Sequence, residues 1–392
     1  MHNYRRVDDL DDAVRIARSA FTIRPVALDA VRSWLDEETQ HGRELHGVDD
    51  GTDLAAIYLL YDFQMRLRSS VIPMGGIGLL CSRLDQRGSG AVRHMILKSL
   101  ETMRDRGFAV SVLDPFDVGF YRKYGWELFS REQRTKLTAG TLAPACEAAQ
   151  GIRIEDLASI DDPSLAFYND FAARSYTLTQ RDKRRWERVF TIRPWDPKTA
   201  VRGILRATAD DRVVGLAVYD LNSEGGYESS MSVDLSICEG HAARSALLGA
   251  LRRLSHQIGS FTLTLPLDVD LWPHLVDRPR ETAVHDMFML RIVSLEQLDG
   301  LRVAAPDLET GIEVVDAQAP WNQGTWTLTV EGGRLSVRRG RRADLRCSIN
   351  GLSAVLSGFS DFREMVQTGN AEALTDGWSD LPRVTSYMAD HF

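Results

Sequence analysis

The spacing of apolar residues along the first third of the chain predicts helices that alternate with strands. Apolar positions recur at helical intervals over residues 8–18, 27–38 and 90–106. Apolar or alternating runs typical of strands lie at residues 53–68, 75–82 and 108–113. The first of these runs is long enough for a pair of strands. Together the elements predict an α/β unit of ordinary domain size.

A glycine-rich turn separates the predicted strand at 75–82 from the helix that begins near residue 90. Its sequence is Gln86-Arg87-Gly88-Ser89-Gly90-Ala91. Such a turn exposes backbone N–H groups at the positive end of the helix dipole, where a pyrophosphate can bind. In the preceding strand, Gly75, Gly76 and Gly78 are compatible with close approach of a ligand, and equally with a bulge or a packing contact.

About thirty residues further on, a short helix carries two tyrosines in the segment Gly119-Phe120-Tyr121-Arg122-Lys123-Tyr124-Gly125-Trp126-Glu127. A tyrosine here can protonate a leaving group. On pattern alone, a Phe-Tyr pair on an amphipathic helix is more often part of the core than catalytic. The glycine-rich turn upstream favours the catalytic interpretation, with Tyr121 as the acid and Tyr124 as its competitor.

A comparable order of elements recurs in the middle of the chain and predicts a duplicated domain. It comprises a hairpin-type strand pair, a strand, a helix and a closing strand at residues 211–219, 232–238, 244–251 and 261–266. The turn before its helix, Glu239-Gly240-His241-Ala242-Ala243, has one glycine and an acid where a phosphate would approach. We therefore expect the second copy to be a non-catalytic scaffold.

The pattern changes again at about residue 287. Strands are predicted at 288–293, 311–316, 325–330 and 333–338, the last two as a hairpin around Glu331-Gly332, and helices at 352–356 and 362–367. The Ala- and Gly-rich stretch 138–151 is the predicted first linker. The sequence therefore predicts three domains, at residues 1–143, 144–286 and 287–392.

The 392-residue chain has a formal net charge of −8, which argues against a nucleic-acid partner and weakly favours cationic small molecules. No apolar run is long enough for a membrane span and no secretory signal is recognisable, so we expect a cytoplasmic protein. The four cysteines and nine histidines show no metal-binding spacing. We expect reduced thiols and no metal.

The turn and the tyrosine segment resemble motifs of the GNAT superfamily of N-acetyltransferases. The turn matches the acetyl-CoA pyrophosphate loop, and Phe120-Tyr121-Arg122-Lys123-Tyr124-Gly125-Trp126 matches the Tyr-x-x-x-Gly-aromatic motif. Over its whole length, including the ending Asp390-His391-Phe392, the chain resembles the enhanced intracellular survival (Eis) family. The resemblance implies an α/β (α+β) fold with tandem GNAT domains, the second degenerate, and a C-terminal domain similar to sterol carrier proteins. It also implies acetyl-CoA as co-substrate and a homo-oligomer, a hexamer in this family.

The resemblance assigns roles to individual residues. The residues expected to contact acetyl-CoA are Gly78, Leu79, Leu80, Gln86, Arg87, Gly88, Ser89, Gly90, Ala91, Phe116 and Asp117. Tyr121 would be the general acid, and the α-carboxylate of Phe392 would be the base. Phe21, Arg24 and Trp34, together with Asp117, would line the amine site.

Two positions depart from the family pattern. Asp85 lies three positions before the first glycine, where the superfamily usually has Arg or Gln. An acid there is unfavourable beside a pyrophosphate unless it points away, and we expect Gln86 and Arg87 to compensate. Pro115-Phe116-Asp117 replaces the family's usual Ala-Ser-Glu, so the acid is kept and the serine is lost.

The resemblance implies an N-acetyltransferase acting on aminoglycoside-like or lysine-like amines. Two other functions stay open. One is a non-catalytic protein that binds CoA or holds an apolar ligand in its carrier-like domain, and the other is an acyltransferase for one dedicated metabolite. Retention of Gly88, Gly90 and Tyr121 argues against the non-catalytic function, because an inactive domain should have lost them.

Overall fold

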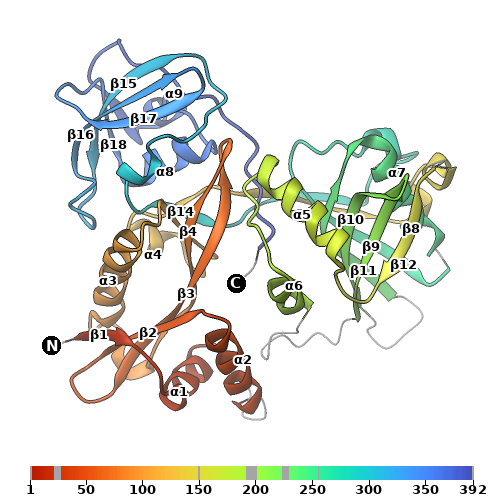
Figure 1. Ribbon diagram of the computed structural model, residues 1–392, viewed down its shortest axis with the longest axis horizontal. Helices are drawn as coiled ribbons and strands as arrows, with labels where there is room; N and C mark the ends of the chain where they lie inside the picture. The colour runs from red at the N-terminus through yellow and green to blue at the C-terminus, as the bar shows by residue number, and fades with distance from the viewer. Residues whose placement is uncertain are drawn as a thin grey trace.

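The computed structural model describes residues 2–21, 28–148, 151–190, 201–222, 229–254 and 256–390. These residues form three β-sheets, two of seven strands and one of five (Figure 1). The two large sheets belong to two similar α/β domains, and the small sheet belongs to a third domain. The predicted arrangement of a duplicated domain followed by a different, smaller one is confirmed.

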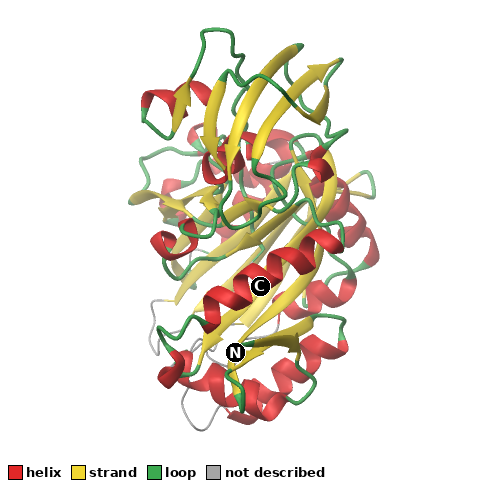
Figure 2. Cartoon of the chain, turned by 90° about the vertical axis from the view of Figure 1, so that its left-hand side faces the viewer, coloured by secondary structure: helices red, strands yellow, loops and turns green. Residues whose placement is uncertain are grey.

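The first sheet has the strand order β1-β2-β3-β4-β5-β14-β6. Its strands are β1 (Asn3–Arg6), β2 (Glu44–Asp49), β3 (Leu54–Leu67), β4 (Ser70–Ser82), β5 (Val110–Leu113), β6 (Glu127–Leu128) and β14 (Met289–Ile292). Its helices are α1 (Leu10–Ala20), α2 (Leu28–Gln40), α3 (Ala91–Asp105) and α4 (Val118–Arg122). Side chains of β3 alternate between the faces, so Leu59 and Tyr61 pack in the cluster with α1 and α2, and Tyr58 and Leu60 pack with α3. Helices therefore lie along both faces of the long strands (Figure 2).

One strand of this sheet was predicted wrongly. Residues 53–68 form a single strand, β3, which makes a hairpin with β4, rather than a pair of strands. The first half of β3 is buried on both faces, whereas Asp62 and Gln64 in the second half are exposed on one face. This change of environment within one strand produced the change of pattern that suggested a break.

The second sheet has the order β13-β7-β12-β11-β10-β9-β8. Its strands are β7 (Arg131–Leu137), β8 (Arg153–Leu157), β9 (Val201–Ala209), β10 (Arg212–Asn222), β11 (Ser229–Cys238), β12 (Ile258–Leu265) and β13 (Glu281–Asp286), and its helices are α5 (Asp162–Arg174), α6 (Lys183–Phe190) and α7 (Gly240–Arg253). The expected strand pair at 211–219 is one strand, β10. Its hairpin partner is β9, and the turn between them places Asp210 and Asp211 in the left-handed region.

The third domain contains β15 (Leu308–Val315), β16 (Gly324–Glu331), β17 (Arg334–Arg339), β18 (Leu345–Ser348), β19 (Ala371–Ala373), α8 (Ile349–Ser357) and α9 (Phe362–Gln367). The predicted hairpin is confirmed as β16–β17, with Gly332 and Gly333 in the turn. Both glycines have positive φ angles, of 54° and 73°, which matches the type of turn favoured in two-residue hairpins.

The first two domains exchange strands across the ranges that the sequence suggested. β7 precedes residue 143 but pairs with β12 and β13 in the second sheet, and β14 follows residue 287 but lies between β5 and β6 in the first sheet. The predicted linker is also structured. Residues 139–141 and 144–148 form short 3-10 helices, with Leu142 and Cys146 buried in the core of the second domain.

Candidate active site

The first part of the site is an opening between β4 and β5. These parallel strands pair only from Met74 to Ile77 on β4, and in the described pairing β4 then continues to Ser82 without β5 beside it. Leu79 has a positive φ of 51°, and the register of β4 against β3 shifts between Gly78 and Cys81. Bulges of this kind redirect backbone groups and are frequent beside active sites. Gly78, Leu79 and Leu80 therefore line the edge of the opening.

Not every glycine of β4 lies at this opening or is needed for it. A Cβ on Gly75 would lie 2.6 Å from the sulfur of Met103 on α3 and 3.2 Å from the ring of Phe108. Gly75 therefore permits close packing of α3 on the sheet, which was one of the two alternatives left open by the sequence.

The glycine-rich turn leads directly into the N-terminus of α3. Gly88 and Gly90 have φ angles of 82° and 91°, and a Cβ on either would meet nothing within 4 Å. The backbone conformation, rather than lack of space, accounts for both glycines. Gly90 is the N-cap of α3 and provides no side-chain cap, while Ser89 accepts a bond from the N–H of Ala91 at 3.3 Å. The positive end of this 15-residue helix is therefore open to an anionic group.

The unfavourable acid in this turn is neutralised locally. Asp85 accepts two hydrogen bonds from Arg83, at 3.0 and 2.5 Å, and the Arg83 guanidinium lowers the pKa of Asp85. Gln86 donates to Asp50 at 3.1 Å, and Arg87 is exposed. Of the two residues expected to compensate for Asp85, Gln86 bonds Asp50 and Arg87 is exposed, so the main partner of the carboxylate is Arg83, which was not predicted.

Tyr121 lies on α4, whose N-cap is Asp117. The carboxylate of Asp117 accepts a hydrogen bond from the N–H of Phe120 at 2.7 Å, so it fixes the start of this helix. Tyr121 is 3% exposed and packs edge-on against Phe116, at 5.3 Å, and Trp126, at 6.4 Å between ring centroids. Phe116 itself is 71% exposed and forms the outer wall beside Tyr121.

Burial raises the pKa of Tyr121, and the neighbouring Asp114 and Cys81 raise it further. These neighbours follow β5 and lie on β4, so the hydroxyl is close to the opening between the strands. The hydroxyl therefore stays protonated and available as a proton donor. Tyr124 is half-buried; burial raises the pKa of its hydroxyl and Arg93 of α3 opposes this rise, so the two tyrosines lie in different surroundings.

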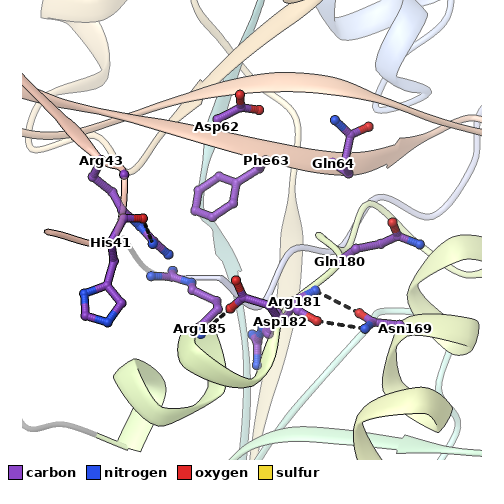
Figure 3. A pocket seen from close by; sticks show the side chains of 11 residues that line it. His41, Arg43, Asp62, Phe63, Gln64, Asn169, Gln180, Arg181, Asp182 and Arg185 are labelled. Carbon is purple, nitrogen blue, oxygen red and sulfur yellow. Dashed lines mark hydrogen bonds between the residues drawn. The ribbon is translucent and has the colours of Figure 1, made fainter. Parts of the chain in front are cut away.

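The second part of the site is a polar pocket of about 420 Å³ between the first and second domains (Figure 3). Its walls are His41, Gly42, Arg43, Asp62, Phe63 and Gln64 on one side and Asn169, Gln180, Arg181, Asp182 and Arg185 on the other. Figure 3 shows Phe63 pointing into the space between β3 and α6, while Asp62 and Gln64 point to the other side of the strand. Asp182 accepts a bond from the N–H of Arg185 at 2.6 Å.

This pocket lies on the α1–α2 face of the first sheet. Phe63 shares a face of β3 with Leu59, and Leu59 pairs with Gly78 at the opening. Four residues along a strand correspond to roughly 13 Å. The pocket therefore lies roughly 13 Å along β3 from the bulge in β4, on the sheet face opposite to the one that α3 covers.

The C-terminal tail runs between the first two domains (Figure 1), and its Asp390 bonds Arg181, which lines this pocket. The carbonyls of Ser386 and Tyr387 accept bonds from the N–H groups of Arg131, at 3.0 Å, and Thr177, at 3.1 Å. Asp390 is fully buried and accepts a bond from Nε of Arg181 at 2.8 Å. Burial opposes its charge, but Arg181 and Arg185 hold the pKa of Asp390 below its ordinary value.

The residues predicted for the amine site are dispersed. Phe21 caps the C-terminal end of α1 and is 40% exposed, and Trp34 is buried in the core beneath α2. Arg24 and Phe392 lie outside the described residues. The sequence analysis missed the arginines of the pocket, because Lys183-Arg184-Arg185 resembles an ordinary solvated basic run.

The described residues of the second domain form no equivalent site. Glu239 precedes α7 and pairs with Arg174 and with Arg212, the latter at 3.2 Å. Between β11 and β12, the described residues leave a cavity of only about 10 Å³, lined mainly by leucines (Leu247, Leu248, Leu251, Leu263, Leu265 and Leu271). Glu239 is the N-cap of α7 but makes no side-chain capping bond, so the clearer difference from the first domain is that leucines fill the space between the strands.

Two absences concern the described residues alone. No group of three or more His, Cys, Asp or Glu side chains among them is arranged to hold a metal ion. In the same part of the chain, no helix has the length and apolar character needed to cross a membrane.

Comparison with protein families assigns each of the three domains. Residues 3–129 and 178–292 match acetyltransferase (GNAT) domains, and residues 295–387 match a sterol carrier protein domain. The chain belongs to the GNAT acetyltransferases and is an acyltransferase. The GNAT fold implies that acetyl-CoA is its co-substrate.

Relatives cover most or all of the chain. A protein from Streptomyces avermitilis described as an uncharacterized N-acetyltransferase is 22% identical over 347 residues, which are 84% of this chain and 83% of the relative. The structure of a GCN5-related N-acetyltransferase from Anabaena variabilis is similar with a TM-score of 0.86 at 18% identity, and that of Eis1 from Mycobacterium abscessus with a TM-score of 0.79 at 21% identity. Both matches cover 100% of each chain. The Eis-like architecture predicted from the sequence is confirmed at the level of the fold.

Proposed function

We propose that this protein transfers the acetyl group of acetyl-CoA to a primary amine, with the chemistry confined to the first domain. The observation that carries the proposal is the coincidence of two features at the β4–β5 opening. One is the uncapped N-terminus of α3 behind Gly88 and Gly90, and the other is the buried, protonated hydroxyl of Tyr121.

In this mechanism the neutral amine attacks the thioester carbonyl, whose oxygen accepts hydrogen bonds from backbone amides of the Gly78–Leu80 segment. The C–N bond forms, the C–S bond breaks, and Tyr121 donates its proton to the departing thiolate. The phenolate recovers a proton from solvent. Gln86, Arg87, Gly88, Ser89, Gly90 and Ala91 bind the pyrophosphate, and Phe116 and Asp117 line the entrance.

The base that takes the proton of the amine is the α-carboxylate of Phe392. Support comes from Asp390, which is held by Arg181 two residues before the chain end and beside the interdomain pocket. An α-carboxyl group has an ordinary pKa of about 3.5, so it acts through a water molecule or on the small neutral fraction of the amine.

The interdomain pocket is proposed as the acceptor site, and the family resemblance adds Phe21, Arg24 and Trp34 as candidate acceptor contacts. Arg43, Arg181 and Arg185 line the pocket, where Arg43 pairs with Glu38 at 3.5 Å and Arg181 with Asp390 at 2.8 Å. Because these charges are already compensated within the protein, the acceptor is proposed as an aminoglycoside-like or lysine-like amine on the family resemblance alone. Asn169 and Gln180 add hydrogen-bonding groups to the wall.

The discriminating experiment measures release of free CoA thiol with a panel of amines, including lysine, its decarboxylated analogue cadaverine, and an aminoglycoside. We expect CoA release with at least one lysine-like or aminoglycoside-like amine, because both classes offer a primary amine to the thioester. Binding of acetyl-CoA without release of CoA for any amine would instead indicate a non-catalytic binding protein.

The proposed setting is a cytoplasmic homo-oligomer, a hexamer by resemblance to the Eis family. Trp272, Val276 and Val284 expose large apolar side chains on the second domain, as an interface between copies would require. Sedimentation of the wild-type protein and of Trp272→Glu tests this, and a monomeric wild-type chain would contradict it.

A further inference from the structure

The helix that carries Tyr121 is too short to hold itself in place. α4 has five residues, Val118–Arg122, and helices of this length are marginal in isolation. Carbonyl groups at the C-terminal end of a helix have no partner in the helix and need donors from elsewhere. The orientation of Tyr121 therefore depends on which groups satisfy these carbonyls.

Two of the donors come from the third domain. Asn350, in the first turn of α8, donates from Nδ2 to the carbonyl of Arg122, at 3.0 Å, and to that of Trp126, at 2.8 Å. Gln318 donates from Nε2 to the carbonyl of Lys123 at 3.2 Å. These two side chains reach across from sequence positions about two hundred residues away to the turn that follows α4.

The third side-chain donor is Arg291 of β14, which donates to the carbonyl of Tyr124, while within the turn the N–H of Gly125 donates to the carbonyl of Arg122 at 3.1 Å. Its guanidinium is fully buried and is held by Asp316 of the third domain through bonds of 2.9 and 2.8 Å. Gly125 has a φ of 95°, and a Cβ at this position would overlap the guanidinium. All four carbonyls, from Arg122, Lys123, Tyr124 and Trp126, are thus bound by side chains that follow residue 290.

The same turn holds the ring of Tyr121. Trp126 is fully buried, packs edge-on against Tyr121 and lies 5.6 Å below the guanidinium of Arg291. A shift of the turn therefore moves the tyrosine, and a displacement of about 1 Å at a reacting group can cost roughly 10²-fold in rate.

We infer that the third domain positions the general acid of the first, with Asn350 as the principal positioning residue. This rests on the proposed role of Tyr121. Asn350 touches neither donor nor acceptor, and acts through α4 by fixing the hydroxyl at the β4–β5 opening. The carrier-like domain is then a structural part of the acetyltransferase site.

The test is a double-mutant cycle between Asn350→Ala and Tyr121→Phe, measured as kcat, with acetyl-CoA affinity followed by calorimetry. Asn350→Ala alone should lower kcat by roughly 10-fold while leaving acetyl-CoA affinity within about 2-fold. In the Tyr121→Phe background it should have almost no further effect, because there is no acid left to position. The matched control is Asn370→Ala, an exposed asparagine of the same domain that bonds only locally, and it should leave kcat unchanged.

Equal fold-losses from Asn350→Ala in both backgrounds would show a general loss of structure and overturn the inference. So would an Asn350→Ala enzyme as active as the control. If Tyr121→Phe alone is fully active, the assignment of the acid fails first, and the inference falls with it. Should Asn350→Ala fail to fold, Gln318→Ala removes a single half-buried donor and is subjected to the same cycle, with a smaller expected loss and the same pattern of non-additivity.

Discussion

The first and second domains share a fold but differ at two equivalent places, the N-terminus of the main helix and the space between two neighbouring strands. In the first, the N-terminus of α3 is open behind Gly88 and Gly90, and the strands β4 and β5 separate beside Tyr121. In the second, Glu239 precedes α7 and pairs with Arg174 and Arg212, and leucines fill the space between β11 and β12. The comparison teaches that the fold alone does not make an acetyl-CoA site, because a helix N-terminus serves a ligand only where the neighbouring strands leave room for it.

The largest effect should come from the acid that only the first domain has. Tyr121→Phe removes the proton donor but keeps the ring, so turnover should fall by roughly 10²–10⁴-fold with acetyl-CoA affinity nearly unchanged. Steady-state kinetics with calorimetry measures both quantities. Tyr124→Phe is the control and should do much less, and equal losses from the two variants would show that the wrong tyrosine has been assigned.

The second-largest loss of turnover is expected from removal of the terminal carboxylate. Amidation of Phe392 by semisynthesis removes the charge and keeps the ring, and should lower turnover by roughly 10²-fold because the base is lost. Single-turnover measurements at saturating acetyl-CoA report this step directly. An amidated enzyme with full activity would end the assignment and return attention to Asp117, although that carboxylate already caps α4.

Substitution of the glycine before each helix allows the two domains to be compared directly. Gly88→Val and Gly90→Val force a β-branched residue into the left-handed region, which costs about 1–2 kcal/mol each, and place side chains where a phosphate would bind. Affinity for acetyl-CoA should weaken by roughly 10- to 100-fold. Gly240 has a similar φ of 79°, so Gly240→Val carries the same backbone strain and should leave affinity unchanged. Two equivalents of acetyl-CoA bound per wild-type chain would contradict the comparison.

The smallest effect is on the pH profile. A general acid works only while it is protonated, and raising its pKa extends that range upward. Burial raises the pKa of Tyr121 above its ordinary value near 10, so kcat should show no alkaline decline up to about pH 10. A decline centred below this pH, absent in Tyr121→Phe, would indicate a solvated hydroxyl with an unshifted pKa.

Local pattern predicted much of this molecule. The glycine-rich turn, α3 and the β16–β17 hairpin follow from residues that are close in sequence, and the structure confirms these elements. What sequence could not supply are contacts between distant segments. The pocket arginines, the bond from Arg181 to Asp390, and the bonds from Asn350 to the turn after α4 all depend on tertiary packing.

The exchange of β7 and β14 makes the two acetyltransferase domains inseparable by any single cut. A fragment ending near residue 129 would lack β14, which lies between β5 and β6, and would expose unpaired strand edges next to Tyr121. During synthesis, the first sheet cannot close until about three-quarters of the chain has left the ribosome, so a nascent chain carries an incomplete site for most of that time. Catalytic activity is therefore expected only after β14 has been synthesised and has paired with β5 and β6. The order of translation thus delays activity until both acetyltransferase domains are complete.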